Sequence, residues 1–300
     1  MKSVRLLSAG AALALLLSAC DASVDVGSNT NLSTEEAQMA ADVVGQSMAD
    51  QSEGMVSDMY DMDAGLEASG LVYHQGPLAR GTGMLEMRLW RPGNRQDGRV
   101  RYDSTTGTHR VTYERTQQMG PNYRSVKADL AYIFTTSTGA FIRDPRRNRD
   151  QIAAIAFEGT REGETRQRRP GDGKEVRNEF KREGSWTLSG LLGTTATFRG
   201  DQTTTGRARV NGADSTERSY TVRLRTENVT VTKTRAQQGL ETTLTGTLQY
   251  EVVLKRPGQD EKRVTGTIDL SQNGRAIMRF MGLQGAYRID LASGAAQREG

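Results

Sequence analysis

Cysteine, histidine, proline and aromatic residues are all scarce in this chain of 300 residues. It has one cysteine, two histidines, six prolines and 6% aromatic residues. A single thiol, Cys20, excludes an internal disulfide and a thiolate metal site. The histidines, His74 and His109, each lack a recognisable partner spacing, so histidine-based catalysis is not expected.

The usual catalytic signatures are also missing. The sequence has no G-x-S-x-G, H-E-x-x-H, S-x-x-K or G-x-x-x-x-G-K-[ST] motif. Carboxylates are plentiful, so a hydrolase that uses a carboxylate pair stays open as an alternative, but no pair stands out. Asp58, Asp61 and Asp63 gather near Gly65 without the EF-hand spacing, which predicts a solvated helix end. We therefore expect a protein that is not an enzyme and has no cofactor or metal.

Basic residues are absent from residues 21–79, which contain eleven Asp and Glu. From residue 80 onward the chain has 38 basic and 25 acidic residues. One interpretation is that both charged surfaces are simply solvated. The other is that the acidic segment docks on the basic part, or that the basic part meets anionic lipid or glycan.

Long apolar runs are confined to the start of the chain. Lys2 and Arg5 precede an apolar stretch at residues 6–17 that is too short to span a bilayer as a stop-transfer helix. Small residues then lead to Cys20, which is the layout of a cleaved secretory signal. The sequence Leu17-Ser18-Ala19-Cys20 resembles the lipobox of bacterial prolipoproteins.

This resemblance implies a lipid anchor. Diacylglycerol would be attached to the Cys20 thiol, the signal peptide of residues 1–19 would be removed, and the new amino terminus would be acylated, for example with palmitate. Several acyl chains together anchor a protein stably. Residues 20–32 would form the lipidated cysteine and a flexible tether. Asp21 resembles the inner-membrane retention signal of enterobacterial lipoproteins, which favours the periplasmic side of the inner membrane over the outer membrane.

An acidic, methionine-rich helix is expected in residues 33–66. Ser33 and Glu36 fit a capping box, and apolar residues then recur at helical spacing over residues 34–63, with a break at Gly54. One face carries four methionines: Met48, Met55, Met59 and Met62. We expect them to pack in the core, although thioethers also suit an exchangeable apolar ligand or Cu(I).

Residues 67–300 are predicted to form an antiparallel β domain. Apolar and polar residues alternate in many segments, for example around Tyr220 and Tyr250, and turn residues separate them. The predicted fold is mainly β, a curved antiparallel sheet or open β-barrel of long hairpins with one N-terminal α-helix packed on it. The polar residues 158–184 are predicted to form a projecting hairpin with both faces wet near its tip.

The predicted function is that of a lipid-anchored bacterial cell-envelope protein that binds lipid or another hydrophobic ligand on a concave β surface. The alternative is a structural or assembly lipoprotein that binds an envelope protein partner. In an exported protein a basic surface favours an anionic envelope partner over nucleic acid. The candidate basic residues are Arg146, Arg147, Arg149, Arg166, Arg168 and Arg169.

Overall fold

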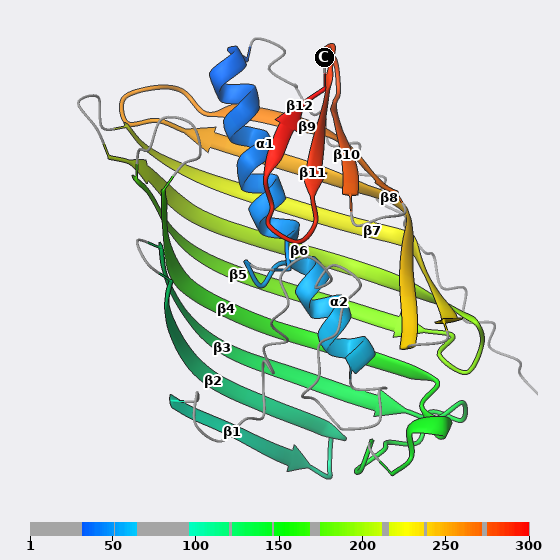
Figure 1. Cartoon of the computed structure of the whole chain (residues 1–300). Helices are drawn as coiled ribbons and strands as arrows, with labels where there is room; N and C mark the ends of the chain where they lie inside the picture. The colour runs from blue at the N-terminus through cyan, green and yellow to red at the C-terminus, as the bar shows by residue number, and fades with distance from the viewer. Residues whose placement is uncertain are drawn as a thin grey trace, which may run out of the picture.

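A long, curved antiparallel sheet dominates the computed structural model, and two helices cross its concave face (Figure 1). The structure describes residues 32–50, 52–64, 96–119, 122–145, 147–168, 175–211, 216–236, 239–271 and 275–299. Within these residues the sheet has 12 strands, and their spatial order follows their order in the chain. The predicted fold, mainly β with a curved antiparallel sheet and one N-terminal α-helix packed on it, is confirmed, and the structure divides the helical segment into two helices.

The helices are α1 (Thr34–Met48), α2 (Met55–Ala64) and the short 3-10 helix η2 (Arg149–Gln151). The strands are β1 (Gln96–Asp103), β2 (Thr108–Met119), β3 (Asn122–Thr135), β4 (Ala154–Arg168), β5 (Glu175–Ser189), β6 (Thr195–Val210), β7 (Thr216–Ala236), β8 (Gly239–Lys255), β9 (Lys262–Ser271), β10 (Arg275–Phe280), β11 (Ala286–Asp290) and β12 (Ala296–Arg298). In the described part of the chain, no helix is long and apolar enough to cross a bilayer.

The hairpin of β4 and β5 does not project from the sheet, so that prediction was wrong. The two strands pair with β3 and β6 almost to their tips, at Tyr123–Arg166 and Val176–Val210. Because both neighbours run alongside, the inner positions of the hairpin face the same concave surface as the rest of the sheet. The polar side chains at these positions are therefore buried: Arg161, Thr165, Asn178 and Arg182.

Helix α1 begins with the predicted capping box. The Glu36 main-chain N–H donates to the Ser33 hydroxyl (3.2 Å), and the Ser33 N–H donates to the Glu36 carboxylate (2.9 Å). The sequence predicted a break at Gly54; the structure ends α1 already at Met48 and begins α2 directly after Gly54. A Cβ at Gly54 would collide with the main chain of Met48, so glycine allows the linker to fold back on α1.

Helix α1 is held closely against the C-terminal hairpin of β11 and β12. A Cβ at Gly45 would collide with the carbonyl oxygen of Gly294, so the two backbones touch without an intervening side chain. The Asp50 N–H also donates to the Leu291 carbonyl oxygen (2.9 Å), and Gln38 Nε2 donates to the Ala296 carbonyl oxygen (2.9 Å). These contacts fix α1 across one end of the concave face.

The core lies between the helices and the concave face of the sheet. Met48 and Met55 are fully buried, and Met59 is 3% exposed, in one cluster with the apolar inner positions of the strands. Apolar burial of this kind is the main stabilising term in folding. We call α1, the linker of residues 49–54 and α2 the helical cover.

Candidate functional site

Two arginines lie directly opposite each other on the concave face. Arg161 of β4 pairs in register with Arg182 of β5, and both side chains are almost completely buried. Strand alternation aims them to the same side as Phe157 and Trp186, under the helical cover. Like charges at directly opposed positions repel each other, so this arrangement requires compensating groups.

Two carboxylates of the helical cover supply that compensation. Asp58 of α2 forms an ion pair with Arg161, and the two side chains are 1% and 2% exposed. Glu53 of the linker forms ion pairs with Arg124 of β3 (2.9 Å) and Arg161 (3.5 Å), and the Tyr113 hydroxyl donates to Glu53 (2.7 Å). We call Glu53, Asp58, Arg124, Arg161 and Arg182 the buried charge cluster.

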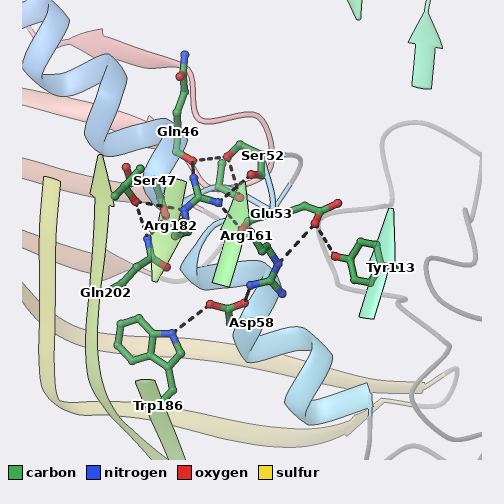
Figure 2. Close-up of polar contacts among 12 residues, drawn as sticks. Gln46, Ser47, Ser52, Glu53, Asp58, Tyr113, Arg161, Arg182, Trp186 and Gln202 are labelled. Carbon is green, nitrogen blue, oxygen red and sulfur yellow. Dashed lines mark hydrogen bonds and ion pairs between the residues drawn. The ribbon is translucent and has the colours of Figure 1, made fainter. Parts of the chain in front are cut away.

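Arg182 binds the main chain of the cover. It donates hydrogen bonds to the carbonyl oxygens of Gln46 (3.2 Å), Ser52 (2.9 Å) and Glu53. The last carbonyls of a helix have no partner within the helix, and a cation is favoured at that end. Arg182 therefore satisfies the end of α1 and holds the linker at the same time (Figure 2).

Trp186 and Gln202 complete the contacts between sheet and cover (Figure 2). The Trp186 indole N–H donates to Asp58 (3.1 Å), and its ring stacks on Phe198 with centroids 4.7 Å apart. Gln202 Nε2 donates to the Ser47 carbonyl oxygen (2.8 Å). Helix α2 is thus attached to β5 through a polar side chain as well as through apolar packing.

The electrostatics of the cluster reflect its burial. Burial raises the pKa of Asp58, while the charges of Arg161 and Arg182 act in the opposite direction. Burial and the neighbouring charge of Arg161 lower the pKa of Arg182 to about 10. Burial therefore disfavours the charged form of each group, and the opposite charges within the cluster compensate for this cost.

The linker also contains an unfavourable backbone conformation. Glu53 has φ 56°, and no other non-glycine residue in the described part of the chain has a positive φ. The left-handed region costs a residue with a side chain on the order of 1 kcal/mol or more. The ion pairs of Glu53 and the hydrogen bond to its carbonyl oxygen hold it there.

A second group of ion pairs joins the start of α1 to the far strands. Glu36 pairs with Lys262 of β9 (2.7 Å), and Glu35 pairs with Arg218 of β7 and with Arg256 (3.6 Å). Together with Glu53 and Asp58, these residues show that the acidic segment docks on the basic part of the chain, which was one of the two interpretations of the charge asymmetry.

We predict that Glu36→Gln makes the stability of the protein less dependent on pH. Burial alone would raise the pKa of Glu36, but hydrogen bonds from Lys262 and Ser33 lower it from 4.5 to about 2. Because the folded-state pKa is the lower one, the carboxylate stabilises the fold above pH 4.5, and this contribution is lost as the pH falls towards 2. With allowance for solvent screening at Lys262, the variant should lose about 2 kcal/mol at neutral pH.

Urea unfolding of the two proteins across this pH range measures the effect. The difference in unfolding free energy should shrink towards zero as the pH falls. Glu183→Gln, in an exposed pair with Lys181, is the matched control and should change little at any pH. A difference between Glu36→Gln and its parent that stays constant with pH would contradict the assignment.

The predicted methionine stripe lies in the core where the structure describes it. Met48, Met55 and Met59 are buried between the cover and the sheet, and the side chain of Met62 lies outside the described residues.

The prediction of a solvated helix end was wrong at Asp58, because its carboxylate is buried against the sheet in contact with Arg161 and Trp186. Among the described residues, no group of His, Cys, Asp and Glu is arranged to hold a metal ion.

The basic candidates that the structure describes lie at two separate places. Arg147 is exposed and pairs with Asp144 (3.3 Å), and Arg149 lies close by, before the start of β4. Arg166 lies near the opposite end of β4, where it pairs with Glu164 and covers the ring of Tyr123 at 5.2 Å. Arg168 ends β4, but its side chain is not described, and four further candidates lie outside the described residues: Cys20, Asp21, Arg146 and Arg169.

The buried arginines were missed from the sequence, although a signal was present. Arg161 has the same strand parity as Phe157, and Arg182 has the same parity as Phe180 and Trp186, so alternation alone places both on the apolar face. The high density of charge around them led instead to the prediction that both faces of the hairpin are solvated near its tip.

His109 is also in the core, where its ring nitrogen lies 3.0 Å from the Ile142 carbonyl oxygen.

The buried charge cluster thus brings charged groups of β3, β4 and β5 together with those of the linker and α2. Comparison of the chain with protein-family models, with curated proteins and with solved structures finds no match.

Proposed function

We propose that this chain is a non-enzymatic, lipid-anchored protein of the bacterial cell envelope that holds a lipid or another hydrophobic ligand on the concave face of its sheet. The anchor is the lipid at Cys20, on the periplasmic side of the inner membrane, with Asp21 as the sorting residue. The observation that carries the proposal is the polar attachment of the helical cover. Its linker and α2 are held over an apolar surface by buried ion pairs.

The surface under the cover suits an apolar ligand. Aromatic and aliphatic side chains line the inner face of the sheet, among them Tyr132, Phe157, Trp186 and Phe198. An acyl chain that replaced α2 would bury the same surface, at roughly 25 cal/mol per Å² of apolar area. The exchange of helix for ligand would therefore keep the inner face of the sheet buried, whereas the apolar side chains of α2, such as Met55 and Met59, would become exposed.

Helix α2 would leave the sheet more easily from these ion pairs than from a purely apolar contact. Buried ion pairs contribute less net stability than apolar residues of similar size, because the charges regain hydration when they separate. The left-handed backbone at Glu53 would relax when the linker leaves the sheet. Helix α1, in contrast, is fixed through Gly45 and Gly294, so we assign the displacement to the linker and α2.

Contact quenching of Trp186 tests the proposal. With Trp90→Phe, Trp186 becomes the single tryptophan of the full chain, and Cys20→Ser removes the thiol that would carry an acyl chain. A fatty acid brominated near its head group, or the monoglyceride of that acid, is then added. We expect saturable quenching, because an acyl chain that replaces α2 would lie beside the indole, which contacts Asp58 of α2.

The control places the indole on the opposite face of the same strand. Thr187 follows Trp186 in β5 and is exposed, so Trp186→Phe with Thr187→Trp moves the indole to the convex face. This control protein should show little quenching. Equal quenching in both proteins, or none in either, would overturn the proposal and leave the assembly role as the better account.

A further inference from the structure

We infer that the ligand is an anionic amphiphile whose carboxylate or phosphate head group binds Arg161, Arg182 and Trp186 in the place that Asp58 occupies. This inference rests on the proposed function and names the chemical class of the ligand. It follows from the donors on the concave face, from the origin of their acceptors and from the aromatic rings beside them.

At this position the sheet presents three side chains that only donate, Arg161, Arg182 and Trp186, beside one hydroxyl, that of Thr204 in β6, which accepts from Arg182 (3.2 Å). A guanidinium has N–H donors and no acceptor, and an indole has a single N–H donor. Arg161 and Trp186 both donate to the Asp58 carboxylate, and Arg182 donates to main-chain carbonyls of the cover. Any occupant of this position must therefore offer acceptor oxygens, and a negative charge is favoured by the two guanidinium groups.

The described acceptors of these donors come largely from the cover. They are the carboxylates of Glu53 and Asp58 and the carbonyl oxygens of Gln46, Ser52 and Glu53. When α2 and the linker withdraw, Arg161 loses the carboxylates of Glu53 and Asp58, and Arg182 loses the carbonyl oxygens of the linker while it keeps the Gln46 carbonyl of α1. A ligand that covers both guanidinium groups would bury their charges with fewer acceptors, which is unfavourable, so an anion that enters with the ligand would replace the lost acceptors. Asp58 thus acts as an internal substitute for the head group.

The surroundings of the arginines fit an amphiphile better than a free anion. The Arg161 guanidinium lies 5.7 Å from the Phe157 ring centroid, and that of Arg182 lies 5.0 Å from the Phe180 centroid. Arginine can bind a carboxylate or phosphate with two parallel hydrogen bonds while it packs on an aromatic ring. The rings continue into the apolar inner face, where an acyl chain attached to that head group would lie.

The test compares two brominated ligands that share the same acyl chain but carry a charged or an uncharged head group. Quenching of Trp186 gives the dissociation constants of the fatty acid and of its uncharged monoglyceride, at about pH 8, where the carboxyl is ionised. We expect the fatty acid to bind about tenfold more tightly, the equivalent of about 1.4 kcal/mol. The cost of displacing the cover is the same for both ligands, so it cancels in this ratio.

A neutral replacement of the ion pair isolates the head-group contribution. Arg161→Gln with Asp58→Asn removes both charges together and leaves neither buried alone, and the affinity ratio should fall by about fivefold, as expected for the loss of a charge-assisted contact. The matched control is Arg110→Gln with Asp129→Asn, which removes an ion pair that is 63% and 44% exposed. Its affinity ratio should equal that of the parent.

Each outcome has a defined meaning. Equal affinities of the two ligands for the parent would overturn the inference while the proposed function stands, and this comparison needs no variant to fold. Quenching by neither ligand would overturn the proposed function itself. Displacement of the brominated fatty acid by inorganic phosphate at a similar concentration would show that a free anion is the occupant, and would also overturn the inference.

Discussion

Arg161→Met is expected to lower the free energy of unfolding by about 3–5 kcal/mol, because removal of one partner leaves the other buried charge uncompensated. Asp58 is 1% exposed and forms its ion pair with Arg161. Among the described residues, the Trp186 N–H would remain as a direct side-chain donor to its carboxylate. Urea unfolding of parent and variant, with equal m-values as a check on two-state behaviour, measures the loss.

A double replacement separates the ion pair from general packing. Arg161→Met with Asp58→Leu replaces both charges by apolar groups, and buried pairs replaced in this way often lose no stability. The double variant should therefore recover most of what the single variant loses. Arg110→Met, at an exposed ion pair with Asp129, is the control and should lie within about 0.5 kcal/mol of the parent. If Arg161→Met cost no more than this control, Asp58 could not be a buried ion.

Met59→Ala is expected to lower the unfolding free energy by roughly 2–5 kcal/mol, as other buried large-to-small replacements do. Met59 is 3% exposed and packs in the cluster between α2 and the sheet. Truncation removes apolar contacts and leaves a cavity that the surrounding structure fills incompletely. Thermal or urea unfolding of the ligand-free protein is the measurement.

Met281→Ala is the matched control for this second prediction. Met281 is 61% exposed, so the same chemical change at that position should lie within about 0.5 kcal/mol of the parent. If Met59→Ala were equally mild and instead reduced ligand occupancy, the methionine face would contact ligand rather than core. That result would enlarge the proposed binding surface to include the cover.

Some features of this protein were predictable because they depend on neighbours in the chain. The capping box of Ser33 and Glu36 is formed by residues three positions apart, and it is present in the structure. The break near Gly54 was predicted from the low helix propensity of glycine, and α2 begins at the next residue. Strand alternation around Tyr220 and Tyr250 likewise reports a local period, and both tyrosines lie on the buried face. Such signals can be recognised without knowing which distant residues come together in the fold.

The buried charge cluster depends on partners that are distant in the chain. Asp58 and Arg161 are separated by 103 residues, and no local pattern distinguishes this carboxylate from a solvated one at a helix end. For the same reason the polar hairpin of β4 and β5 was predicted to project, although β3 and β6 flank it over nearly its whole length. Burial of a charge is decided by what covers it.

The sequence by itself determined the fold class, the location of the N-terminal helical segment, and the excess of acidic residues in one segment and of basic residues in the other. Only the tertiary structure decided which of those charges meet. Period and capping are properties of a short stretch of chain, whereas the pairing of Arg161 with Asp58 requires the register of β4 and β5 and the position of α2 together. Because a charge is stable in the core only with its partner, the candidate site exists only once the sheet and its cover have assembled.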